Sequence, residues 1–248
     1  LTISPTGLNY TDYDQLFADP KVDGVYISLP NKFHLPTAIR AMQAGKHVLC
    51  EKPLGMNAQE VQEAIAVSKK MGVLFVEASW NRWHPRTQRM HEIVQSGELG
   101  AITRIRSAFT YDGLDAENIR LDPSIGGGIL YDLGPYSTVA PLWLLDFPEV
   151  SDVVVQSIFH KSGVDETTRV NYKLGDAICE TVTSCNIPET SWLIVEGEKG
   201  SVRMGGMNAF NSRHAGSALE IEIGGVASVE NFEPCDPYQL MADAFVRR

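Results

Sequence analysis

The sequence predicts an α/β protein in two parts: a partial Rossmann-like parallel sheet, followed by an α+β domain with a large, mostly antiparallel open sheet. In the first part, strand-length apolar runs alternate with helices of about 10–15 residues, the pattern of crossover units and a parallel sheet. From residue 101 onward the hydrophobic period falls to two and few helices intervene, as in antiparallel sheets. We therefore expect one domain over residues 1–80 and another over residues 81–248, with the boundary near residues 79–85.

The first part contains three expected strands, each followed by a turn. Pro36 fits only the first turn of a helix, and Gly45 and Gly72 are typical helix stops. Because the carboxyl ends of parallel strands meet at one edge of a sheet, these turns should lie together, where open α/β sheets bind ligands. The expected strands cover residues 22–29, 47–52 and 73–78, and the expected helices cover residues 12–18, 34–44 and 57–71.

A lysine at the end of a short buried strand is the first chemical feature. Val48, Leu49 and Cys50 are compact and apolar, as a strand covered on both faces requires. Pro53 cannot donate to a sheet ladder, and it favours an extended conformation for Lys52 before it. The ammonium group is therefore expected at the carboxyl edge of the sheet, where a half-shielded lysine suits proton transfer to and from an oxygen. On this stretch alone, a solvated lysine at a strand end is an equal alternative.

The second part begins with a helix and continues with strands whose apolar residues alternate. Residues 86–96 form an expected helix that ends at Gly97, and residues 238–248 form another. The expected strands cover residues 101–109, 153–158, 168–174, 178–186 and 192–196. A consecutive series of strands with few helices predicts a mostly antiparallel sheet.

A glycine run between these strands leads into a second candidate site. Residues 126–128 form an expected flexible turn, and the helix after it is expected to run towards Leu145. Asp132 and Tyr136 are four residues apart, so they share a helix face if the helix is regular there, which Pro135 limits. From these residues alone, an N-terminal cap and a core aromatic are the more common interpretation.

Composition sets wider bounds on function. The 248 residues include 21 basic and 31 acidic ones, so the formal charge of −10 makes nucleic acids and acidic membrane surfaces poor partners. No apolar run approaches the roughly 18 residues of a membrane helix, and the four cysteines have neither metal-site nor disulfide-scaffold spacing. A cytoplasmic location is the expectation. No metal site is expected either, because His84, His91, His160 and His214 show no ligand spacing.

Three motifs occur in order along the chain. They are Pro30-Asn31 with His34, the run from Ala44 to Pro53, and the run from Gly126 to Gly134. Together they resemble the Gfo/Idh/MocA family of nicotinamide-dependent oxidoreductases. The resemblance runs from about residue 10 to residue 148, and residues 195–203 again resemble a hairpin of the family's second domain. Residues 77–85 and 132–136 are most similar to its dihydrodiol dehydrogenase and D-xylose dehydrogenase branch.

The resemblance implies an enzyme that transfers a hydride between NADP or NAD and a secondary alcohol or carbonyl of a sugar, polyol or cyclic diol, with NADP favoured by the branch. The implied catalytic residues are Lys52, Asp132 and Tyr136. The implied cofactor-binding residues are Leu29, Pro30, Asn31, His34, Glu51, Lys52 and Arg82. The implied substrate-binding residues are Trp80, Arg120, Asp132 and Tyr136.

The implied mechanism departs from the commonest family pattern at one position. Many members carry His where this chain has Tyr136, whereas the dihydrodiol dehydrogenase-like and glucose–fructose oxidoreductase-like branches carry Tyr. A phenol can relay a proton if a neighbouring ammonium, here that of Lys52, stabilises the phenolate. The substrate's hydroxyl proton would pass to Tyr136 or Lys52, in an order that the sequence leaves open, while Asp132 orients the substrate or the lysine.

Several alternatives remain open at this point. The same fold in this family also serves as a non-catalytic, sugar-responsive regulator, although a regulator has no need of a proton relay. Asn31 and His34 can be structural residues of a turn and a helix start, and Arg120 can simply pair with Asp122.

The dinucleotide fold is expected to be incomplete in this chain. No Gly-x-Gly-x-x-Gly follows a strand, although such a turn holds the pyrophosphate in Rossmann folds. We therefore expect the chain to begin inside the fold, to end within a helix, and to bind NAD(H) or NADP(H) poorly by itself. A cofactor-free relic is the less favoured alternative.

The second domain is expected to form a homodimer or a higher homo-oligomer. The strand near residues 177–184 alternates Ile178, Glu180 and Val182 with Cys179, Thr181 and Thr183, and neither face is strongly charged. Large open sheets of the family commonly pack face to face across a two-fold axis, which implies an isologous interface of roughly 2,000 Å² or more. A monomer with a polar open face is the alternative.

Overall fold

The computed structural model describes residues 9–205, 209–210 and 215–248, so His214 lies outside the described residues. The chain divides into two compact units, Leu1–Ala78 and Ser79–Arg248, and each is described by itself. In the part of the chain that the structure describes, no helix is both long and apolar enough to cross a membrane.

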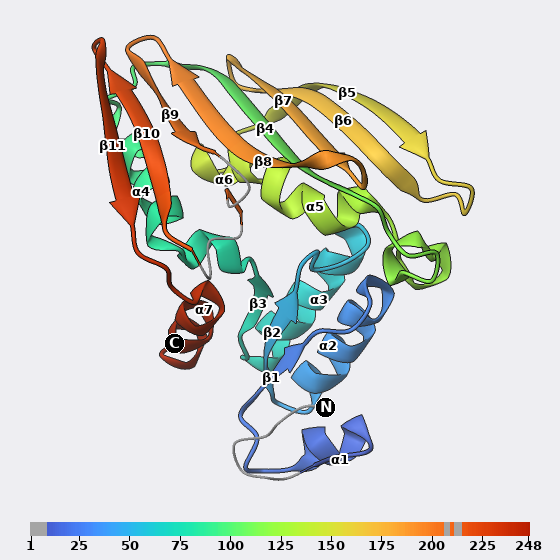
Figure 1. Ribbon diagram of the computed structural model, residues 1–248. Coiled ribbons are helices and arrows are strands. Elements are labelled where there is room, and N and C mark those ends of the chain that lie inside the picture. The colour runs from blue at the N-terminus through green and yellow to red at the C-terminus, as the bar shows by residue number, and fades with distance from the viewer. Residues whose placement is uncertain (1–8, 206–208, 211–214) are drawn as a thin grey trace. The chain divides into compact units, whose positions relative to one another are not determined.

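The first unit is a parallel sheet with crossover helices, as the alternating pattern predicts (Figure 1). Its strands are β1 (Gly24–Ile27), β2 (His47–Glu51) and β3 (Phe75–Ala78), paired in that order. The connections contain the 3-10 helix η1 (Asn31–Phe33), α2 (His34–Gln43) and α3 (Ala58–Met71), and α1 (Tyr13–Ala18) precedes the sheet. Asn57 caps α3 by accepting from the Glu60 amide at 3.0 Å, and Gly72 ends it at φ 68°.

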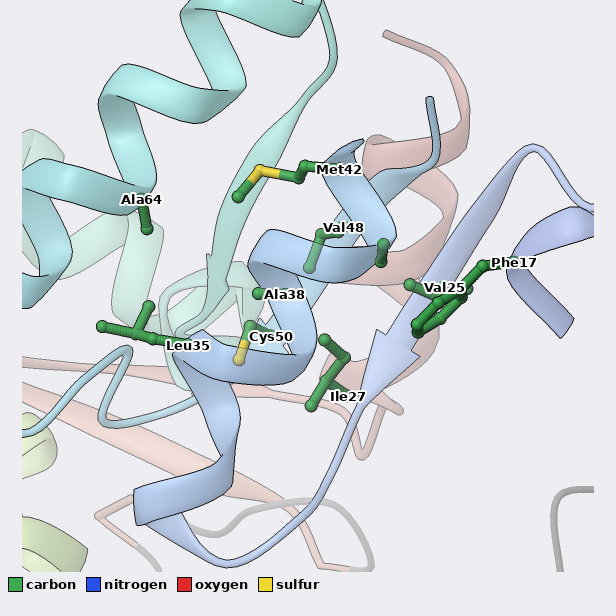
Figure 2. Packing of buried hydrophobic residues seen from close by; sticks show 10 residues of the cluster. Phe17, Val25, Ile27, Leu35, Ala38, Met42, Val48, Cys50 and Ala64 are labelled. Carbon is green, nitrogen blue, oxygen red and sulfur yellow. The ribbon is translucent and has the colours of Figure 1, made fainter. Parts of the chain in front are cut away.

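The core of the first unit lies between the sheet and α2 (Figure 2). Alternate residues of the strands, such as Ile27 and Cys50, point towards it, and Ala38 of α2 is fully buried there. A small residue at that position lets the helix lie close to the strands. The packed helix therefore fixes the carboxyl ends of β1 and β2, from which the candidate site of this unit extends.

The second unit is built on a large open sheet, as predicted, in the order β11-β10-β9-β8-β4-β7-β6-β5. Among the strand pairs that the structure describes in this sheet, β4 and β7 are the only parallel neighbours. The strands are β4 (Ile102–Asp112), β5 (Val150–Phe159), β6 (Asp165–Leu174), β7 (Ala177–Ser184), β8 (Asn186–Gly197), β9 (Gly200–Met204), β10 (Ser217–Ile223) and β11 (Val226–Phe232). The main helices are α4 (Pro85–Ser96), α5 (Ile129–Ser137) and α6 (Ala140–Leu144), which lie on one side of the sheet (Figure 1), and α7 (Pro237–Val246). Short 3-10 helices are η2 (Trp80–Trp83), η3 (Ile119–Leu121) and η4 (Pro123–Ile125).

Two features of the second unit differ from the sequence prediction. The single helix expected to run towards Leu145 is broken into α5 and α6. Pro141 has no amide hydrogen to continue the ladder of α5, and it instead occupies the first turn of α6. Strands β10 and β11 were not predicted, although Leu219 and Ile221 alternate with glutamates in β10.

The two faces of the large sheet differ in character. Ile105 and Cys179 belong to the face that the helices cover, and both are fully buried. The opposite face carries cross-strand ion pairs of 2.5, 2.9 and 3.8 Å, which are Arg104–Glu180, Arg106–Glu196 and Arg203–Glu220. Hydrogen bonding to Arg104 holds the pKa of Glu180 below its usual value. Ile178 lies on the same open face and is 47% exposed, so this face mixes paired charges with apolar side chains.

Candidate active site

The candidate site of the first unit lies at the carboxyl ends of β1 and β2. His34, which is buried, connects the two loops that follow these strands. Its Nδ1 lies 2.8 Å from the Pro53 carbonyl oxygen, and its Nε2 lies 2.7 Å from the Leu29 carbonyl oxygen. Since both ring nitrogens contact the protein's own backbone, the imidazole fixes the loop that contains Lys52 relative to the loop that contains Pro30 and Asn31.

Two carboxylates hold the loop around the lysine. The Lys52 amide donates to Glu51 Oε2 at 3.1 Å, and the Tyr26 hydroxyl donates to Glu51 Oε1. Two residues later, the Leu54 amide donates to Glu77 Oε1 at 3.1 Å. The Lys52–Pro53 peptide bond is cis, and Lys52 itself is half-buried. The backbone that carries the Lys52 ammonium is therefore held on both sides.

In the second unit, the glycine run brings a loop against the start of α5. The Gly127 amide donates to the Asp122 carbonyl at 2.9 Å, and the Gly128 amide donates to the Arg120 carbonyl at 2.8 Å. A Cβ at Gly127 would lie 2.6 Å from the carbonyl oxygens of both Arg120 and Asp122. Only glycine allows this approach, and Gly128 also has a φ of 133°, which disfavours side chains.

This close approach brings the Arg120 guanidinium into contact with the Asp132 carboxylate. The Arg120 Nε lies 2.6 Å from Asp132 Oδ2, and Nη2 lies 3.3 Å from Oδ1. Burial disfavours the charged guanidinium, but the hydrogen bonds and charge of Asp132 outweigh it and hold the pKa of Arg120 above its usual value. The Asp132 side chain is only 15% exposed, so the two-point contact fixes the orientation of its carboxylate.

Tyr136 lies one turn further along α5, in an aromatic cluster. Trp80 Nε1 donates to its hydroxyl oxygen at 2.7 Å. The Trp80 ring also stacks on Tyr238 at 4.8 Å, and the Tyr136 ring meets Phe109 edge-on at 5.5 Å. An N–H donor at the phenol oxygen stabilises the phenolate more than the phenol, which suits a residue that takes up and releases a proton.

The sequence-predicted site residues thus form local groups within each unit. Leu29, Pro30, Asn31, His34, Glu51 and Lys52 lie at the strand edge of the first unit, whereas Trp80 contacts Tyr136 and Arg120 contacts Asp132 in the second. Arg82 has a different environment. Its guanidinium lies 5.5 Å above the Trp143 ring and 5.8 Å above the Phe147 ring.

Sequence reasoning missed Tyr111, an aromatic residue near the Arg120–Asp132 ion pair. Tyr111, near the end of β4, packs against Ile129, Leu133 and Cys185. Burial, and then the charge of Asp132, raises the pKa of Tyr111 well above its usual value. The available signal was the alternation of the strand, which continues to Asp112, three residues past its predicted end at residue 109.

Comparison with known families gives two adjoining matches. Residues 3–79 match a profile described as "oxidoreductase family, NAD-binding Rossmann fold", and residues 87–203 match one described as "GFO/IDH/MocA C-terminal domain".

Three relatives cover between 79% and 96% of the chain. An uncharacterized oxidoreductase of Rhizobium meliloti is 34% identical over 96% of this chain and 73% of its own length. The NADP-dependent D-xylose 1-dehydrogenase 2 of Haloferax volcanii is 35% identical with the same coverage. The mouse trans-1,2-dihydrobenzene-1,2-diol dehydrogenase is 32% identical over 79% of this chain and 59% of its own length.

Solved structures confirm the predicted fold. A 3-ketoreductase from Actinomadura kijaniata, in complex with NADP and TDP-benzene, has a TM-score of 0.85 at 23% identity, covering 95% of this chain and 73% of that one. An aldose–aldose oxidoreductase from Caulobacter crescentus, complexed with glycerol, has a TM-score of 0.86 at 24% identity, covering 95% and 71%.

Proposed function

The chain belongs to the Gfo/Idh/MocA family of oxidoreductases, and from this premise we propose that it oxidises or reduces a sugar, polyol or cyclic diol with a nicotinamide cofactor. The observation that carries the proposal is the Asp132 carboxylate, held at two points by Arg120 one helical turn before Tyr136. A fixed carboxylate beside a phenol suits a substrate that presents neighbouring hydroxyl groups. The relatives of this chain that act on D-xylose and on a cyclic diol support this substrate class.

We propose that the first unit is part of the cofactor-binding domain. Its polar groups suit the nicotinamide end of such a cofactor, because they can bind ribose hydroxyls and a carboxamide. They are the hydroxyl of Tyr26, the amide of Asn31, the ammonium of Lys52 and the carboxylate of Glu51. The proposed set is Leu29, Pro30, Asn31, Glu51, Lys52 and Arg82, and His34 supports it through the backbone of the two loops. The cofactor, when bound, supplies the hydride chemistry. NADP is favoured over NAD, because the relative that acts on D-xylose uses NADP.

In this proposal His34 acts on the loop rather than on the cofactor's polar groups. Both of its ring nitrogens contact backbone carbonyl oxygens, at 2.8 and 2.7 Å. It therefore keeps the loop of Lys52 in place while the ammonium holds or moves a proton at the substrate oxygen.

The second unit is proposed to bind the substrate and to take part in proton transfer. The Trp80 indole donates to the Tyr136 oxygen, and the Tyr136 hydroxyl is proposed to exchange a proton with a substrate oxygen. Asp132, oriented by Arg120, is proposed to accept a hydrogen bond from a substrate hydroxyl and so to orient the reacting carbon. Trp80 provides a rigid wall beside Tyr136, because it is stacked on Tyr238.

The proposal is tested by turnover on a panel of substrates. At a saturating concentration of NADP⁺, which offsets the weak binding expected of this chain by itself, the protein is expected to oxidise D-xylose or a cyclic trans-diol and to produce NADPH, measured by its absorbance. Tyr136→Phe should lower kcat by about 10²–10³, because the proton carrier is lost. Tyr13→Phe, on an exposed side chain of α1, is the matched control and should behave as wild type. Turnover of Tyr136→Phe equal to that of the control would contradict the assigned role.

We also propose a homodimer, or a higher homo-oligomer, of a cytoplasmic enzyme, formed through the open face of the large sheet. The ion pairs of that face neutralise its arginines within one protomer, so apolar side chains such as Ile178 and Val182 can be covered without burying unpaired charges. Light scattering at micromolar concentrations is the test. A monomer mass throughout would contradict this assembly.

A further inference from the structure

We propose that Asp165, the first residue of β6, is a positioning residue that fixes α5 and thereby orients Asp132 and Tyr136. This inference rests on the proposed function of those two residues. Asp165 lies on a strand of the same unit, in a part of the sequence that no motif marks.

Helix α5 has no cap from its own segment. Its N-cap residue is Gly128, which has no side chain to accept from the amides of the first turn. Asp165 Oδ2 accepts from the Leu130 amide at 2.8 Å instead. Leu130 is the second residue of the helix, which is where an N-cap side chain usually bonds. Asp165 therefore takes the role of the cap from a neighbouring strand, and its negative charge suits the helix N-terminus.

The carboxylate is itself held in place. The Thr168 hydroxyl, which is buried, donates to the same Oδ2 at 2.9 Å, and the Ser157 hydroxyl lies 2.9 Å from that of Thr168. On the other side, a Cβ at Gly128 would lie 2.7 Å from Asp165 Oδ1. The absence of a side chain at Gly128 thus makes room for the carboxylate, and α5 is tied to β6 at its first turn.

The position of this tie makes it relevant to the reaction. Asp132 lies two residues after Leu130, and Tyr136 lies one turn further along the same helix. A first turn without a cap frays, and a shift of about 1 Å in a reacting group can cost roughly 10²-fold in rate. The proposed cofactor-binding residues of the first unit lie outside this helix, so cofactor affinity should not depend on Asp165.

The test compares Asp165→Ala with Asp165→Asn. Asparagine keeps one carbonyl oxygen that can accept from both Leu130 and Thr168, whereas alanine removes the acceptor. Asp165→Ala is expected to lower kcat by about 10–100-fold with unchanged cofactor affinity, and Asp165→Asn to recover to within about threefold of wild type. Asp176→Ala, in the turn after β6, is the control and should leave kcat unchanged.

Hydrogen exchange of the α5 peptides provides a readout that needs no turnover. Asp165→Ala should lower the protection of residues 129–133 by about tenfold or more, Asp165→Asn should restore it, and α4 should not change. Unchanged protection in Asp165→Ala, or equal losses of protection in both variants, overturns the inference whether or not the protein turns over a substrate. If the wild type reduces no NADP⁺ while the exchange pattern is as expected, the proposed function fails and the positioning of α5 stands.

Discussion

The two candidate regions of the molecule differ in how their residues are gathered. In the first unit, the site follows directly from strand ends, and backbone carbonyls of two loops meet one imidazole, that of His34. In the second unit, side chains from separate segments of the chain meet, and the Asp132 carboxylate depends on Arg120, on the glycine run and on Asp165. The first region is fixed by the topology of a parallel sheet, whereas the second is fixed by specific contacts between side chains.

The largest effect is expected in the first region, at the lysine itself. Lys52→Met should lower kcat by roughly 10²–10⁴ if the ammonium is a general acid or base, with cofactor affinity largely intact. Lys69→Met, in the last turn of α3, is the control. Near-normal turnover of Lys52→Met with an unchanged pH profile would remove the lysine from the mechanism.

In the second region, we expect activity to depend on the two-point contact between Arg120 and Asp132, and not on the positive charge of Arg120 alone. Arg120→Lys keeps a positive charge but cannot reproduce both hydrogen bonds to Asp132. It should lower kcat/KM by about 10–100-fold, measured by steady-state kinetics. If the lysine variant keeps full kcat/KM, the orientation of the Asp132 carboxylate is not critical.

The sequence could predict the first region because its determinants are local. A strand that ends in Lys52-Pro53 and another that leads to Pro30-Asn31 place their ends at one edge by topology alone. The same local patterns identified most of the fold. They did not predict β10 and β11. They also predicted one helix in place of α5 and α6, because the effect of Pro141 on a helix depends on its exact position in it.

The second region could be predicted only in part. A motif and its resemblance to the family predict Asp132 and Tyr136 as candidate site residues. The partner of Asp132 was not found, because Arg120 reaches it through a close approach of Gly127 and Gly128 to the preceding loop. The cap of α5 was missed for a similar reason, since Asp165 lies 35 residues from Leu130 along the chain.

The glycine run offers a purely steric test of this difference. Gly127→Ala places a Cβ 2.6 Å from the backbone carbonyl oxygens of Arg120 and Asp122. Unlike the end of a flexible side chain, these backbone atoms cannot rotate away. The variant should lose about 2–3 kcal/mol of unfolding free energy, measured by denaturant titration. Gly216→Ala is the control, because its Cβ would lie at an ordinary 3.6 Å from the Phe232 carbonyl oxygen. Equal stability of the two variants would show that the loop yields and does not clamp α5.

The smallest effect concerns the stability of the second unit towards acid, which we expect to depend on His84. Burial, and then the charge of Arg86, lowers the pKa of His84 from 6.5 to about 4. The folded state therefore binds this proton more weakly than the unfolded state. The contribution of neutral His84 to the free energy of unfolding is complete above pH 6.5 and is lost progressively as the pH falls towards 4. The loss amounts to about 2 kcal/mol at pH 5.

The variant His84→Asn isolates this effect. Asparagine can still cap α4 by accepting from the Arg86 amide, as His84 Nδ1 does at 3.1 Å, but it does not titrate. Thermal unfolding of the variant should lose the part of the pH dependence that lies between pH 6.5 and 4. A variant whose curve parallels that of wild type would assign the acid sensitivity to other groups.

Transfer of deuterium tests the central claim, that this chain moves a hydride between a carbinol carbon and a nicotinamide, most directly. The protein is incubated with a saturating concentration of NADP⁺ and a panel of sugars and diols that carry deuterium on the carbinol carbons, and the mass of the reduced cofactor is measured by mass spectrometry. We expect a reduced cofactor that is one mass unit heavier than with unlabelled substrate, formed more slowly because a C–D bond breaks. Reduced cofactor without the label, or no reduced cofactor with any member of the panel, would contradict the claim.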